Sequence, residues 1–160
     1  MDAVQMRDLL EHYRKLRGGL ENCKGDIRRI RRSSFDAYIE EKTYRSPLNG
    51  TRQHGGKPSS PTETLGMYVR KQFEVERDYQ LHRLQRRMAE RQAILWQLDN
   101  LITQLAEQEK EIIVRRYVQG GRVEDVYESL GISRATAFRR LEAGIIHLAG
   151  MYNKLYDAVA

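Results

Sequence analysis

Residues 123–141 read VEDVYESLGISRATAFRRL. A helix of about eight residues is expected in the first half of this run, because its apolar residues recur at helical spacing. These residues are Val123, Val126, Tyr127 and Leu130. Gly131 then lets the chain reverse tightly, Ile132 fills the angle between two helices, and Ser133 caps the helix that follows. This spacing is typical of a helix-turn-helix.

The helix that follows Ser133 is expected to have two different faces. Its inner, apolar face consists of Ala137, Leu141, Ile145 and Leu148. Its outward positions are short or cationic, and no acidic residue lies between Gly131 and Leu141. Such side chains can approach base edges and phosphates closely, which predicts a recognition helix for the major groove. The predicted DNA-contacting residues are Ser133, Arg134, Ala135, Thr136, Arg139 and Arg140.

Another short helix is expected just before these two, over residues 107–118. Its apolar face consists of Ile112, Ile113 and Tyr117. Gly120 and Gly121 should end it, because glycine accepts the left-handed conformation found at helix C-termini. Residues 106–160 contain 8 Lys and Arg against 8 Asp and Glu. This part of the chain is therefore neutral overall, so DNA binding must depend on where its charges lie.

Two runs, EKEIIVRRY at residues 109–117 and the run at 123–141, resemble region four of bacterial sigma factors. That region reads the upstream promoter element through the second helix of its helix-turn-helix. The resemblance implies DNA contacts by Arg134, Thr136, Arg139 and Arg140. Nothing before Leu105 resembles the segment with which sigma factors melt promoter DNA. The whole organisation is similar to phage late-gene transcriptional activators of the RinA/ArpU type, which implies a switch for packaging and structural genes.

From Met6 to Ile30 the apolar residues follow a seven-residue repeat. One row is Met6, Tyr13, Leu20 and Ile27, and the other is Leu9, Leu16, Cys23 and Ile30. The repeat predicts a long amphipathic helix whose narrow apolar stripe must pack against another helix. Interior glycines disfavour a helix, so a kink or break is expected near Gly18.

All three prolines fall between Ser46 and Pro61, which predicts a flexible linker over residues 46–61. A long helix should begin at Pro61, with Ser60 as its cap. A second heptad pattern follows, with Leu81, Met88, Leu95 and Ile102 on one row and Leu84, Leu98 and Leu105 on the other. Arg91 interrupts this pattern, either as a device that sets the register or as a side chain that snorkels from the edge.

The two heptad helices each offer one apolar stripe. The stripes can pair as a hairpin within the chain, or they can meet between chains and form a homo-oligomer. We expect an all-α protein, a long helical hairpin or coiled coil followed by a small helix-turn-helix domain. The expected parts are an N-terminal helical region (1–45), a flexible linker (46–61), a long heptad-bearing helix (62–105) and a helix-turn-helix domain (106–160).

The net charge, the cysteine count and the distribution of apolar residues agree with this predicted organisation, but they do not identify a partner. The net charge of +6 is compatible with a polyanion such as double-stranded DNA. Cys23 is the only cysteine, so no disulfide can form within the chain. The sequence has neither a cleavable signal pattern nor a long apolar run. We therefore expect a soluble protein of the bacterial cytoplasm that does not bind membranes.

A second basic cluster consists of Arg28, Arg29, Arg31 and Arg32. It could hold a DNA backbone or an acidic partner, although a solvated helix end is the simpler interpretation. The four histidines lack metal-ligand spacing, and no serine or cysteine has a recognisable catalytic partner motif. We therefore predict no metal site, no cofactor and no enzymatic activity.

The pattern favours a transcription regulator whose N-terminal helices self-associate or contact host RNA polymerase. A phage terminase small subunit, which binds packaging-site DNA, is an alternative because it also joins a helix-turn-helix to oligomerising helices. A structural coiled-coil protein whose C-terminal helices bind only another protein is the alternative without DNA. The mass of the assembly and a salt-dependent DNA association would separate these classes.

Overall fold

The computed structural model describes residues 1–45 and 61–157 of the chain. All regular elements in these ranges are helices and no strand occurs among them, which confirms the predicted all-α class. The linker expected over residues 46–61 lies outside the described residues except for Pro61, where a helix begins. None of the helices in the described ranges is both long enough and apolar enough to span a membrane.

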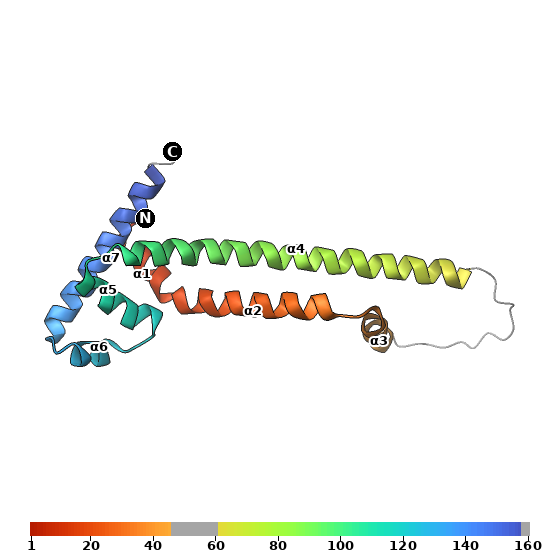
Figure 1. Cartoon of the computed structure of the whole chain (residues 1–160), viewed down its shortest axis with the longest axis horizontal. Helices are drawn as coiled ribbons and strands as arrows, with labels where there is room; N and C mark the ends of the chain where they lie inside the picture. The colour runs from red at the N-terminus through yellow and green to blue at the C-terminus, as the bar shows by residue number, and fades with distance from the viewer. Residues whose placement is uncertain (46–60, 158–160) are drawn as a thin grey trace. The chain divides into compact units, whose positions relative to one another are not determined.

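The helices follow one another as in Figure 1. They are α1 (Ala3–Glu11), α2 (Tyr13–Arg32), α3 (Phe35–Arg45), α4 (Pro61–Thr103), α5 (Glu107–Ile113), the π-helical turn η1 (Val114–Val118), α6 (Val123–Ser129) and α7 (Arg134–Asp157). The chain divides into two compact units. The first unit contains Met1–Glu21 and Ala89–Ala160, and the second contains Asn22–Met88.

The N-terminal helix breaks at His12, and the break expected near Gly18 is wrong. Asp2 begins α1 with a capping box, in which its carboxylate accepts from the amide of Gln5 at 2.8 Å and the Gln5 side chain accepts in return. The change of direction between α1 and α2 is visible in Figure 1. Gly18 lies inside α2, because the packing of that helix outweighs the low helix propensity of glycine.

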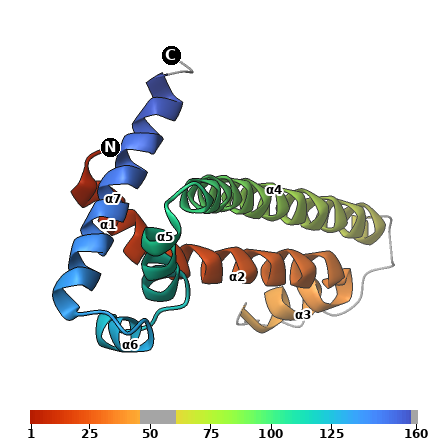
Figure 2. The ribbon, with the colours of Figure 1, turned by 60° about the vertical axis from the view of Figure 1, so that its left-hand side comes forward.

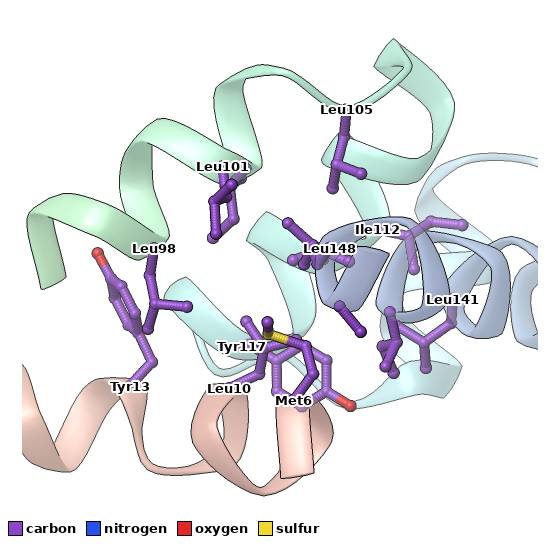
Figure 3. Packing of buried hydrophobic residues seen from close by; sticks show 14 of the residues in the cluster. Met6, Leu10, Tyr13, Leu98, Leu101, Leu105, Ile112, Tyr117, Leu141 and Leu148 are labelled. Atoms are coloured by element: carbon purple, nitrogen blue, oxygen red, sulfur yellow. The ribbon is translucent and has the colours of Figure 1, made fainter. Parts of the chain in front are cut away.

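The core of the first unit joins α1 to the C-terminal helices. Figure 3 shows Met6 and Leu10 of α1 pointing at side chains from α4, α5, η1 and α7. Leu10 is completely buried, whereas its neighbour Leu9 is only partly buried. Of the two heptad positions in α1, Met6 is therefore completely buried, and Leu9 packs only at the edge of the core. The reason is the break at His12, which lets α7 rather than a coiled-coil partner decide the buried face of α1.

The division of the chain differs from the expected one. The core of the first unit includes Leu98 and Leu101 of α4 together with Ile145 and Leu148 of α7. The C-terminal helices consequently share a core with α1 and the end of α4, and this core crosses the boundary expected between residues 105 and 106. In Figure 2, α1 lies along α7, and α6 lies at the opposite end of α7 from the C-terminus.

The two heptad stripes meet within the chain in the first unit. The hydroxyl of Tyr13 in α2 donates to the Asp99 carboxylate in α4 at 2.8 Å. Burial, together with this bond, raises the pKa of Tyr13 to about 12. Arg91, the exception in the second heptad, donates from Nη1 to the carbonyl oxygen of Gly19 at 2.6 Å. A Cβ at Gly19 would lie 2.8 Å from that nitrogen, so the glycine makes room for the arginine.

The second unit is organised around aromatic residues of α3 and α4. The ring of Phe73 in α4 lies 5.7 Å from Phe35 and 5.0 Å from Tyr38, both in α3. The Tyr38 hydroxyl donates to Glu76 at 3.0 Å. Cys23 of α2 is buried here, which agrees with its predicted role in packing.

Alanine substitutions of Leu9 and Leu10 test which face of α1 is buried. Leu10→Ala should lower the free energy of unfolding by about 2–5 kcal/mol, because it opens a cavity in the core. Leu9→Ala removes a partly exposed side chain and should cost clearly less. Urea unfolding of both variants measures the difference. If Leu9→Ala were the more destabilising change, the sequence heptad and not the α1–α7 packing would describe this helix.

Candidate nucleic-acid interface

The helix before the helix-turn-helix ends in a π-helical turn. The amide of Gln119 donates to the carbonyl of Val114 at 2.9 Å, which adds one residue to the last turn. Gly120 follows with φ of 81°, so the predicted glycine end of this helix is confirmed. Tyr117 in this turn is buried in the core.

The turn between α6 and α7 has the predicted glycine geometry. Gly131 has φ of 62°, a left-handed conformation that disfavours other residues. Its amide donates to Glu128, and the amide of Ile132 donates to Tyr127, both at 3.1 Å. These two bonds form a Schellman motif, which satisfies the last carbonyls of α6. The chain therefore leaves α6 in one defined direction.

Ser133 caps α7 as predicted. Its hydroxyl accepts from the amide of Thr136 at 3.2 Å, and its carbonyl accepts from the amide of Ala137 at 3.0 Å. The Thr136 hydroxyl also lies 2.9 Å from the Ser133 hydroxyl. The hydroxyl groups of Ser133 and Thr136 therefore lie next to each other at the start of α7.

The first two turns of α7 bring the predicted DNA-contacting residues together. Ser133, Arg134, Ala135 and Arg139 are exposed, and Thr136 and Arg140 are partly buried. The opposite face is buried, and it consists of the predicted residues Ala137, Leu141, Ile145 and Leu148. The side chains expected to meet DNA therefore point away from the core.

Phe138 lies at the edge of this exposed face. The guanidinium of Arg134 sits over its ring at 5.6 Å from the centroid. This cation–π contact restrains Arg134, because the residues are one helical turn apart. Arg139 is on the outer side of the helix and is exposed.

Glu142 is the first acidic residue of α7, and an arginine from α1 neutralises it. Arg7 donates from Nη2 to the Glu142 carboxylate, and both side chains are about half exposed. The pair joins residues 135 positions apart in the sequence. Sequence reasoning missed Arg7, because no local pattern connects α1 to α7. The result is a cationic face that no uncompensated carboxylate of α7 interrupts before Glu142.

Acidic residues of α5 bound the other side of this face. Arg139 and Arg140 line a shallow hollow together with Glu107 and Glu109. The Glu109 carboxylate lies within hydrogen-bond distance of His147 Nδ1, at 2.8 Å, and the Glu107 carboxylate lies 3.4 Å from the Lys110 ammonium. The cationic surface is therefore narrow, which explains how a neutral segment can present a basic face.

The second basic cluster belongs to the second unit. Arg28, Arg29, Arg31 and Arg32 are exposed at the end of α2. Arg29 lies 3.4 Å from Asp26. Cations at a helix C-terminus are stabilised by the helix dipole, so this position gives the cluster a structural explanation that requires no ligand.

No protein-family model, curated protein or solved structure matches the chain. The resemblance to region four of sigma factors therefore depends on residues 109–117 and 123–141. The geometry of Gly131 and Ser133 agrees with a helix-turn-helix.

Two glycine substitutions test the turn. An added Cβ would meet nothing within 4 Å at either Gly131 or Gly150. Neither substitution therefore causes a steric clash with a neighbouring residue. Gly131→Ala should lower the free energy of unfolding by about 1–2 kcal/mol, because alanine resists positive φ. Gly150→Ala lies inside α7 and should raise it by about 0.5–1 kcal/mol. Thermal or urea unfolding measures both changes in stability. If the two substitutions changed the free energy of unfolding in the same direction, the turn geometry would be contradicted.

Proposed function

We propose that this chain is a sequence-specific DNA-binding transcription regulator that inserts the first two turns of α7 into a major groove. The observation that carries the proposal is the exposed, capped start of α7, where Arg134 and Arg139 face outward and no acidic residue intervenes. Recognition helices contact base edges with their N-terminal residues. The Schellman turn at Gly131 ends α6 and sets the direction in which the chain enters α7.

Each side chain of this face has a role that fits its chemistry. Arg139 and Arg140 can donate to phosphates or to guanine, and Arg134 can do so from the edge next to Phe138. The hydroxyls of Ser133 and Thr136 can bind phosphate or bases, and Ala135 is short enough for close approach. The neutral overall charge implies that binding depends on these few contacts.

We further propose that the regulator activates late genes of a bacteriophage in the bacterial cytoplasm. The support is the resemblance of residues 109–117 and 123–141 to sigma region four, together with the heptad-bearing helices that precede them. Contact with the host RNA polymerase would follow from such a role. Selection of bound sequences from random and phage genomic DNA tests the proposal, and failure to enrich any sequence would contradict it.

Alanine substitutions in α7 test the DNA-contacting residues. Arg139→Ala and Arg140→Ala should each weaken binding to the selected DNA and reduce the slope of log affinity against log salt by about 0.9 if they contact one phosphate. Arg83→Ala, in α4, is the matched control because Arg83 is exposed and lies outside both basic clusters, and it should bind like the wild type. Gel-shift titrations at several salt concentrations measure the effect. Wild-type affinity for both α7 variants would refute this placement of the interface.

The pair between Arg7 and Glu142 offers an independent test. Arg7→Ala should weaken DNA binding, because it leaves the Glu142 carboxylate uncompensated beside the cationic face. Glu142→Gln in the same chain should restore the affinity, and Glu142→Gln alone should not reduce it. Fluorescence anisotropy with labelled DNA measures all three variants. If the double variant bound as weakly as Arg7→Ala, a charge effect at Glu142 would be excluded.

A further inference from the structure

Helix α4 carries a second stripe that the core does not use. Its buried face in the first unit consists of Leu95, Leu98, Leu101, Ile102 and, just past its end, Leu105. On the opposite side, other residues recur at alternating steps of four and three, which is the spacing of a coiled-coil seam. We name them the outer stripe, and they are Ala89, Ala93, Trp96, Asn100 and Thr103.

The outer stripe itself carries no charge. Between residues 89 and 104 its five residues are flanked by the amides Gln92, Gln97 and Gln104 and by the exposed carboxylates Glu90 and Asp99. The chain as a whole has 31% charged residues, and a helix face that only meets water usually carries many of them. Trp96 nevertheless exposes 69% of its surface. A large exposed aromatic residue in an uncharged stripe indicates an interface.

The outer stripe combines a projection with a hollow. Trp96 projects from α4, and the hollow beside it is lined by Ala93 and Asn100 of the same helix and by Leu155 of α7. The alanine is small and Leu155 is 46% exposed, so an apolar side chain of a partner could enter. All these residues belong to the first unit.

We propose that the outer stripe binds the same stripe of a second copy of this chain. A two-fold interface pairs one surface with itself, so each partner must supply both a projection and a matching recess. Trp96 and the hollow beside it supply them on one face. Asn100 is the one amide among the five stripe residues, and an amide can both donate to and accept from its counterpart. Such a residue in a seam penalises other registers.

The same heptad register continues along α4 in the second unit. Tyr68, Val75 and Tyr79 fall on the two rows of the outer stripe, which also include Gln72, and His82 and Arg86 separate them from Ala89. Their exposed fractions are 68%, 62% and 68%, respectively. Large apolar side chains left exposed at this spacing provide a second observation in favour of a helical partner with the same spacing, which a second copy has.

Self-association of this kind goes beyond the proposed function and does not depend on it. If both hold, each dimer brings two copies of α7 to DNA, and binding of one copy raises the effective concentration of the other. The stripe is separate from the predicted DNA-contacting residues, because these lie on the first two turns of α7. The two proposals can therefore fail separately.

Trp96 also provides the measurement, because it is the only tryptophan in the chain. The full chain, without DNA, is studied by sedimentation equilibrium over about 1–100 μM, the range of a moderate dissociation constant. We expect a monomer–dimer equilibrium in which Trp96 emission moves to shorter wavelength and becomes less accessible to acrylamide as the dimer forms. A chain that stays monomeric throughout would overturn the proposal.

Two variants locate the interface. Ala93→Glu retains the tryptophan and places a charge in the stripe, and it should raise the dimer dissociation constant at least about tenfold. Trp96→Glu should do the same. Val4→Glu is the matched control, because Val4 in α1 is also 69% exposed but lies outside the stripe, and it should dimerise like the wild type. Circular dichroism checks that all three variants keep their helical content.

A dimer that tolerates Ala93→Glu and Trp96→Glu, or in which Trp96 stays equally quenchable, would place the contact elsewhere and overturn the proposal. Loss of dimerisation in both variants, with wild-type behaviour of Val4→Glu, would support it. DNA affinity of the wild type is measured separately, so a failure of DNA binding leaves the dimer result intact.

Discussion

The first unit depends on burial of the inner face of α7. Leu141, Ile145 and Leu148 lie on that face, and α1, α5 and α6 all pack against the helix. Each fully buried side chain of this kind contributes roughly 1.5–3 kcal/mol, whereas an exposed ion pair such as the one between Arg7 and Glu142 contributes about 0–1 kcal/mol. Apolar burial therefore fixes which face of α7 points outward, and the ion pair changes only the charge of that face.

The turns could be predicted from the sequence, because each depends on a few neighbouring residues. Gly131 and Ser133 needed only the helical periods on either side of them. The position of α1 could not be predicted, because its partner α7 is far away in the sequence, and the heptad that selected Leu9 continued across the break at His12. Arg7 carried no local signal for the same reason. The all-α class was predictable, whereas the core that joins the two ends of the chain was not.

Charge placement gives the candidate interface its character. Segment 106–160 is neutral, yet two carboxylates near the start of α7 have partners: Glu109 contacts His147, and Glu142 pairs with Arg7. The apolar residues of helix α4 are likewise divided between two faces. One of its faces is buried in the core of the first unit, and the other leaves Trp96 exposed. The first unit thus presents one narrow cationic face on α7 and one uncharged stripe on α4.

The packing of α1 on α7 has a consequence for folding. Contacts between residues so distant in sequence form late, because the chain between them must first be ordered. During synthesis, Met6 and Leu10 leave the ribosome long before Leu148. The apolar face of α1 therefore stays exposed to solvent until α7 has been synthesised. The exposed surface at the start of α7 is then fixed only after the residues of its buried face, as far as Leu148, have been translated. Chains that end before Leu148 would therefore lack the buried face that orders α7.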